Sequence, residues 1–140
     1  MISVEADVWL INGTLYIGHE LEALTPDRTF DGLYIQPLVT ILNLQNPVTP
    51  FTAGANVGPV YGSSVNSNLT FRGVFDRDGT QTLYLFVDVK TDGATTWPAV
   101  VSALQPLRDN GWLTRVNGEN IKKGPITVVG TGYTHLFNSN

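Results

Sequence analysis

Residues Ser3–Glu20 read SVEADVWLINGTLYIGHE, and this stretch indicates both how the chain begins to fold and where its chemistry lies. Apolar residues alternate with Glu5 and Asp7, which is the two-residue period of a β-strand. An Asn-Gly pair at 12–13 then supplies the signal of a tight hairpin turn, before a second β-rich run at Thr14–Ile17. The stretch therefore predicts a β-hairpin whose two acidic side chains share one face.

Glu5 and Asp7 are candidate metal ligands, because residues two apart on a strand are separated by only about 6.6 Å along it and can converge on one cation. The competing interpretation is a solvated strand face, which is the usual position of acids on a half-exposed strand. His19 favours a site, since imidazole exchanges protons near neutral pH. A strict hairpin register would point His19 away from the carboxylates, unless Gly18 allows the backbone to turn it back.

The composition describes one domain and excludes several classes of function. A chain of 140 residues with 42% hydrophobic and 14% charged residues is large enough to bury a core. The net charge of -4, without a run of Lys or Arg, argues against nucleic acid as a partner and against electrostatic docking on anionic membranes. The absence of cysteine excludes disulfides and thiol catalysis, and no apolar run reaches the roughly 18 residues of a transmembrane segment.

The localisation is not given by the sequence, which shows no signal peptide after Met1. Two Asn-x-Thr triplets, at Asn12 and Asn68, would suit a secreted parent protein, although such triplets also arise by chance.

Strand and helix patterns alternate along the rest of the chain. Residues 31–45 predict a helix that Pro37 divides into a short first piece and a longer second one, and residues 46–81 predict a long loop or insertion. The nearly continuous apolar run at Leu83–Lys90 is typical of a parallel strand covered on both faces. Three further elements are expected: a helix opened by Thr96 and ended at 110–111, a strand at Leu113–Val116 and a buried strand at Pro125–Val129.

Asp88 and Lys90 lie two residues apart at the C-terminal end of the best strand, where parallel-sheet enzymes place their working groups. An ordinary ion pair at a strand end is the alternative. Gly130-Thr131-Gly132 follows the last predicted strand and is read as a tight turn more readily than as a loop that approaches a phosphate.

Five segments in combination resemble one known superfamily: VEADVWL, LYIGHE, RTFDGLYIQPL, LYLFVDVKTDG and GPITVVGTG. They resemble the PLC-like phosphodiesterase superfamily, which includes glycerophosphodiester phosphodiesterases and sphingomyelinase D-like phospholipases. Within it they are most similar to the fungal group of altered inheritance of mitochondria protein 6-like proteins. The resemblance extends over about residues 4–133, and each motif alone is only weakly specific.

This resemblance implies a (β/α)8 TIM-barrel hydrolase of phospholipid or glycerophosphodiester head groups. It implies a divalent cation, Mg²⁺ or Ca²⁺, held by Glu5, Asp7 and Asp88. His19 matches one of two catalytic histidines, and Lys90 matches a group that stabilises charge on the phosphoryl oxygens.

Two departures from the family pattern qualify this expectation. The family's other histidine lies on a strand before the Glu-x-Asp strand, where this chain has only residues 1–4, and His135 is a poor substitute. Only about four of the eight barrel strands are recognisable. We therefore expect a single PLC-like phosphodiesterase domain at 1–140 that is truncated at both ends and forms a partial barrel. The exposed edges of such a partial barrel favour self-association. The alternative function is a non-catalytic remnant or interaction module.

Overall fold

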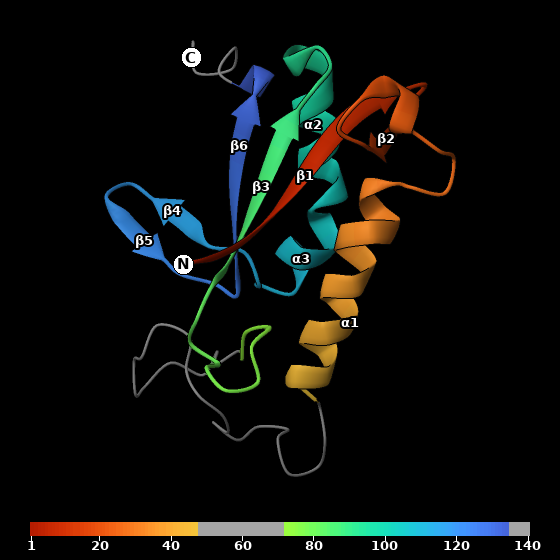
Figure 1. The fold of residues 1–140 in the computed structure, drawn as a ribbon. Helices are drawn as coiled ribbons and strands as arrows, with labels where there is room; N and C mark the ends of the chain where they lie inside the picture. Colours follow the sequence, from red (N-terminus) through yellow and green to blue (C-terminus); the bar gives the residue numbers. More distant parts are fainter. Residues whose placement is uncertain (48–71, 135–140) are drawn as a thin grey trace.

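The structure, a computed structural model, describes residues 1–47 and 72–134. Its main sheet has the strand order β2-β1-β3-β6, and a separate two-stranded ribbon is made by β4 and β5 (Figure 1). The strands are β1 (Ile2–Ile11), β2 (Thr14–Ile17), β3 (Leu83–Val89), β4 (Arg115–Asn117), β5 (Asn120–Lys122) and β6 (Ile126–Gly132). The α/β class is confirmed. In the described residues the sheet is open and does not close into a barrel, so the partial TIM barrel stays a prediction.

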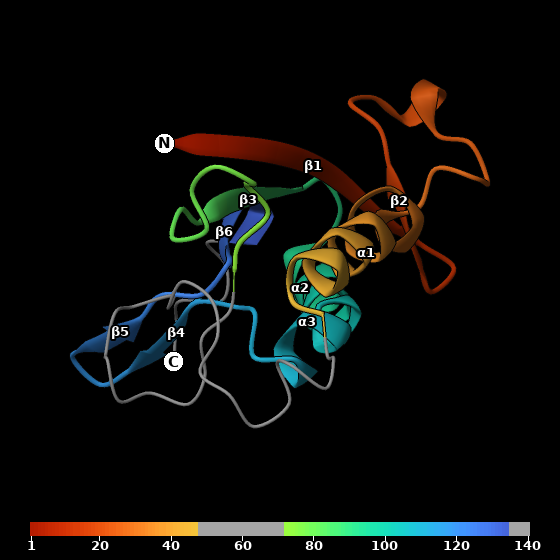
Figure 2. The ribbon, with the colours of Figure 1, turned by 90° about the horizontal axis from the view of Figure 1, so that it is seen from below.

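Strand β3 is the centre of the sheet and pairs in parallel with both β1 and β6. Its residues alternate strictly: Leu85 and Val87 are fully buried, whereas Phe86 and Asp88 are half-buried. Figure 2 shows why, since the α-helices lie together on one side of β1, β3 and β6. The parallel arrangement is confirmed, but the expectation that both faces of the strand are covered is wrong for the described part of the chain.

The hairpin of β1 and β2 has the predicted turn and register. Asn12 and Gly13 both have positive φ, 49° and 80°, which is the conformation that a two-residue type I′ turn requires. Val8 pairs with Ile17 and Ile11 with Thr14. Because the turn fixes the register, Ala6 and Val8 face the core and the acids of β1 face the opposite side of the sheet.

The first helical region is divided as Pro37 predicts. A short 3-10 turn, η1 (Leu21–Ala23), follows the hairpin, and a π-helical turn, η2 (Asp31–Ile35), leads directly into α1 (Gln36–Gln45), with the proline in its first turn. Proline is tolerated there because the first amides of a helix have no intrahelical acceptor.

The second helical region begins earlier than predicted. Helix α2 (Gly93–Ala103) is capped by Asp92, whose carboxylate accepts the Thr95 N–H at 3.2 Å, and α3 (Gln105–Asp109) follows it. Thr96, the predicted cap, is buried, and its hydroxyl is 2.6 Å from that of Thr91, which lies between β3 and α2. Asp92 and Thr96 are both residue types that favour the N-cap position. Asp92 caps the helix, and the buried Thr96 side chain contacts Thr91 instead. None of the helices in residues 1–47 and 72–134 is both long and apolar enough to cross a membrane.

The last strands differ from prediction at their bounds. The strand expected at Leu113–Val116 is shifted to β4, which pairs with β5 around a Gly118-Glu119 turn. Strand β6 starts one residue later and ends three residues later than expected, so it includes both Gly130 and Gly132. The tight turn expected at 130–132 is therefore wrong, because the strand continues through these residues.

Two predictions fall outside the described residues. Most of the long loop predicted at 46–81 falls in residues 48–71, which the structure does not describe. His135 falls in the second such segment, 135–140.

Leu85→Ala is expected to destabilise the fold by about 2–5 kcal/mol, because it leaves a cavity where a fully buried leucine packs at the centre of the sheet. The matched control is Leu44→Ala on α1, where the same change removes a side chain that is 76% exposed and should cost less than about 0.5 kcal/mol. Urea unfolding measures both. Equal losses would contradict the assignment of β3 to the core.

Candidate active site

The two acidic strands are held side by side by the parallel register. Asp7 on β1 is the direct partner of Asp88 on β3, and Glu5 is the partner of Phe86. Partners in a parallel pair point to the same side of the sheet, so burial of Ala6 and Val87 on one side directs both aspartates to the other. Core packing therefore brings together carboxylates that lie 81 positions apart in the sequence.

Glu5, Asp7 and Asp88 each offer a carboxylate oxygen, and these three oxygens lie within 4.8 Å of one another. Asp7 and Asp88 are mostly screened from solvent, with side chains 19% and 18% exposed, whereas Glu5 is exposed. Two oxygens bound to one Ca²⁺ at 2.3–2.6 Å can be at most about 5 Å apart. The spacing of the three oxygens is therefore compatible with one divalent cation bound between them.

Lys90 lies beside this cluster and bridges the two aspartates. Its Nζ is 2.7 Å from Asp88 Oδ2 and 3.7 Å from Asp7 Oδ1, and its side chain is 25% exposed. The hydrogen bond to Asp88 raises the pKa of Lys90, and the charges of Asp88, Asp7 and Glu5 add to this against the opposing effect of burial. Lys90 is therefore held as a cation among the acids.

His19 reaches the same group of residues from the end of β2. Its Nδ1 is 3.4 Å from Asp7 Oδ2, at the long end for a hydrogen bond, and the side chain is 81% exposed. Pairing of the hairpin extends to Gly18, whose N–H donates to the Asp7 carbonyl oxygen at 3.2 Å, and the chain then leaves the strand. The departure at Gly18 allows His19 to turn back toward the carboxylates.

Two aromatic side chains that the sequence did not single out support these positions. The Trp9 indole donates to the Gly18 carbonyl oxygen at 2.7 Å, next to His19, and the Tyr34 hydroxyl donates to the Glu5 carbonyl oxygen at 2.6 Å. Burial, followed by the charge of Asp7, raises the pKa of Tyr34 and keeps its hydroxyl protonated. Trp9 could have been noticed, because it continues the Glu5, Asp7 alternation on β1, but the contact of Tyr34 needs the fold.

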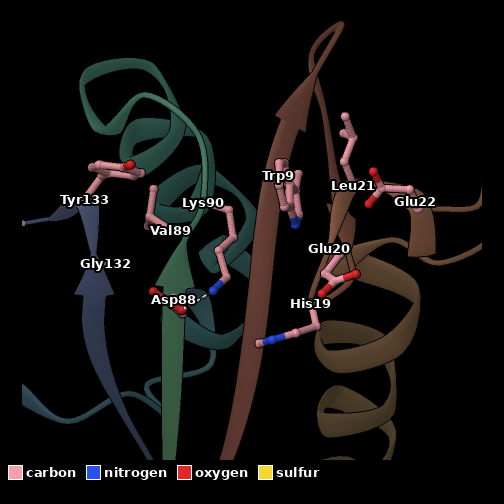
Figure 3. Close-up of a pocket in the computed structure, with 10 residues that line it drawn as sticks. All are labelled: Trp9, His19, Glu20, Leu21, Glu22, Asp88, Val89, Lys90, Gly132 and Tyr133. Atoms are coloured by element: carbon pink, nitrogen blue, oxygen red, sulfur yellow. Dashed lines mark ion pairs between the residues drawn. The ribbon is translucent and has the colours of Figure 1, made fainter.

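An open cleft of about 560 Å³ lies at this end of the sheet. Figure 3 shows Lys90 directed toward Asp88 and the His19 ring lying over β1. The cleft is lined by Trp9, His19, Glu20, Leu21, Glu22, Asp88, Val89, Lys90, Gly132 and Tyr133. Three of the five residues singled out in the sequence thus line a cleft, and Glu5 and Asp7 join them through the carboxylate cluster. That Glu5, Asp7 and Asp88 bind metal and that His19 and Lys90 are catalytic stay predictions.

Comparison with known proteins gives the relatives of this chain. It is 50% identical over 136 residues to an altered inheritance of mitochondria protein 6 homolog of Arthroderma benhamiae, covering 96% of this chain and 39% of that protein. It is 32% identical over 135 residues to altered inheritance of mitochondria protein 6 of Eremothecium gossypii, covering 93% and 31%. The chain thus spans less than half the length of these curated relatives. No solved structure matches it.

Comparison with models of protein families gives a match over nearly the whole chain. Residues 1–139 match the AIM6-like phosphodiesterase domain, a match that includes all five candidate site residues. With this match and the fungal relatives, the chain belongs to the AIM6-like phosphodiesterase domain family.

Proposed function

We propose that this chain forms the cation-binding part of a metal-dependent phosphoric diester hydrolase that acts on phospholipid or glycerophosphodiester head groups. The observation that carries the proposal is the convergence of three carboxylates within 4.8 Å, beside Lys90 and His19, in a member of a phosphodiesterase domain family. Hard carboxylate oxygens match a hard cation, Mg²⁺ or Ca²⁺.

The acidic cluster needs positive charge before an anionic substrate can approach it. Glu5, Asp7 and Asp88 would hold the cation, which when bound neutralises charge on the phosphodiester. Lys90 compensates the two aspartates that it contacts, and its ammonium group is placed to stabilise charge that develops on phosphoryl oxygens at the cleft.

His19 would transfer the proton. A carboxylate can only accept, so the contact with Asp7 Oδ2 assigns the donor role to Nδ1 and leaves Nε2 to take a proton from an attacking hydroxyl or water. The exposed ring lies at the mouth of the site, where substrate can reach it.

We also propose that the sheet is a segment of a TIM barrel. Three features support this: β1, β3 and β6 are parallel and adjacent, the α-helices of the described residues lie on one face, and the candidate site lies toward the C-terminal ends of the strands (Figures 1 and 2). In a barrel, the face that carries the acids would be the interior.

A non-catalytic interaction module is the second candidate. It is favoured by one observation: His19 is the only imidazole in residues 1–47 and 72–134, whereas hydrolysis of this kind is expected to use a general acid and a general base. Such a module would keep the cation site and lack turnover.

Hydrolysis of lysophosphatidylcholine, sphingomyelin and glycerophosphocholine distinguishes the two candidates. We expect the 140-residue chain to release one phosphomonoester and one alcohol per diester hydrolysed with Mg²⁺ or Ca²⁺ present, and EDTA to stop the release until excess cation is restored. Cation binding without turnover would replace the hydrolase by the interaction module. Turnover that is insensitive to EDTA would contradict the role of the carboxylates.

A further inference from the structure

We propose that Gly132, at the end of β6, is the residue that positions the Asp88 carboxylate. The significance of this for cation binding rests on the proposed function, but the contact itself does not. Gly132 pairs with Val89 in the parallel register, so it lies beside the residue that follows Asp88. Both Gly132 and Asp88 line the cleft (Figure 3).

The space that a side chain would need at position 132 is already filled by the site. A Cβ built on Gly132 would lie 2.3 Å from Asp88 Oδ1, 2.5 Å from the Val89 carbonyl oxygen and 3.0 Å from the Val89 nitrogen. Gly132 also has a φ of 71°, in the left-handed region that favours glycine. The missing side chain is therefore what allows β6 to end directly against this carboxylate.

The two oxygens of Asp88 have different surroundings as a result. Oδ2 contacts Lys90 Nζ at 2.7 Å, and Oδ1 lies too close to the position of a Cβ on residue 132 for both to be accommodated. Any side chain at 132 must rotate the carboxylate or separate the ends of β3 and β6. Either movement disturbs the ion pair with Lys90 and the approach of Asp88 to Asp7.

Other glycines of the chain provide matched controls. Gly118 has a similar φ of 62°, but a Cβ there would meet nothing within 4 Å, so Gly118→Ala measures backbone strain alone. Gly130 lies two residues earlier on the same strand, and a Cβ there would lie 2.9 Å from the Trp97 ring and from the Thr134 methyl group instead of a carboxylate. Gly130→Ala therefore measures crowding on β6 away from Asp88.

The first test is the affinity for Ca²⁺ and Mg²⁺, measured by isothermal titration calorimetry. We expect Gly132→Ala to weaken binding by about 10- to 100-fold, the usual effect of disturbing a residue that orients a ligand. Gly118→Ala and Gly130→Ala are expected to bind as the unaltered chain does. Unchanged affinity in a folded Gly132→Ala chain, or equal weakening in all three variants, would overturn the proposal.

The second test needs neither metal nor substrate. Gly132→Ala is introduced into the unaltered chain and into Asp88→Ala, and the fall in melting temperature is compared. We expect a smaller fall in the Asp88→Ala background, because the clash with Oδ1 is gone while the contacts with Val89 remain. If Gly132→Ala alone does not fold, a folded double variant supports the proposal. Equal falls in the two backgrounds, or a double variant as unfolded as the single one, overturn it. A chain that shows this coupling but binds no cation would overturn the proposed function and leave the positioning role intact.

Discussion

Asp7→Asn is expected to lower the affinity for Ca²⁺ or Mg²⁺ by at least about 10- to 100-fold and to abolish measurable hydrolysis. That range is the usual effect of losing a residue that only orients a ligand, and Asp7 is itself a candidate ligand. Asp7 is the centre of the site. Its carboxylate lies within 4.8 Å of those of Glu5 and Asp88, 3.4 Å from His19 Nδ1 and 3.7 Å from Lys90 Nζ. Asparagine keeps the size of the side chain and removes the charge on which all these contacts depend.

The control for this prediction is Asp109→Asn, the same change at an exposed aspartate at the end of α3. It should leave both cation affinity and melting temperature unchanged. Calorimetric titration with each cation and the hydrolysis assay measure the two effects. If Asp7→Asn binds the cation as tightly as Asp109→Asn does, the carboxylate cluster is a charged strand face and not a metal site.

Local signals in the sequence were enough for the hairpin and for the parallel sheet. The Asn-Gly pair fixes the turn because both residues adopt positive φ, and the turn fixes which side chains face the core. The apolar run of β3 predicts a parallel strand, and its pairing with β1 and β6 confirms this, although only one of the two expected covered faces is found in the described residues. These features depend on residues close in the sequence, so periodicity reveals them.

Features that depend on tertiary contacts could not be predicted. Thr96 was expected to cap a helix, and a hydrogen bond with Thr91 buries it instead. Gly132 was expected in a turn, yet it extends β6 against Asp88. Neither contact leaves a local pattern, because the partner in each case is selected by how β3 packs with α2 and β6.

Part of the candidate site could be predicted from local sequence spacing, and part of it depends on tertiary contacts. The two-residue spacing of Glu5 and Asp7 predicted that they share a face, and the parallel register then brings Asp88 beside them. The orientation of His19 could not be decided from the hairpin register, which points it away. The hydrogen bonds that Gly18 makes with Asp7 and Trp9 hold the backbone at the point where it leaves the strand. From there the chain turns the His19 side chain toward the carboxylates.

His19→Ala is expected to slow hydrolysis by about 10²- to 10⁴-fold while leaving the affinity for the cation unchanged. The imidazole contacts Asp7 only through Nδ1 at 3.4 Å and belongs to the cleft and not to the carboxylate cluster, so its loss should remove proton transfer without removing a ligand. The measurements are the initial rate of hydrolysis and a calorimetric titration of the same preparation.

Added imidazole provides the sharper readout for this role. Because the His19 side chain is 81% exposed, imidazole from solution can reach the place that the ring vacates, and we expect it to restore part of the rate in His19→Ala. The matched control is His135→Ala, the same change at the second histidine of the chain, which should neither slow hydrolysis nor respond to imidazole. The opposite outcome is that His19→Ala lowers the rate and the cation affinity equally and that imidazole does not restore the rate. This result would assign His19 to holding Asp7 in place and would leave proton transfer to another group.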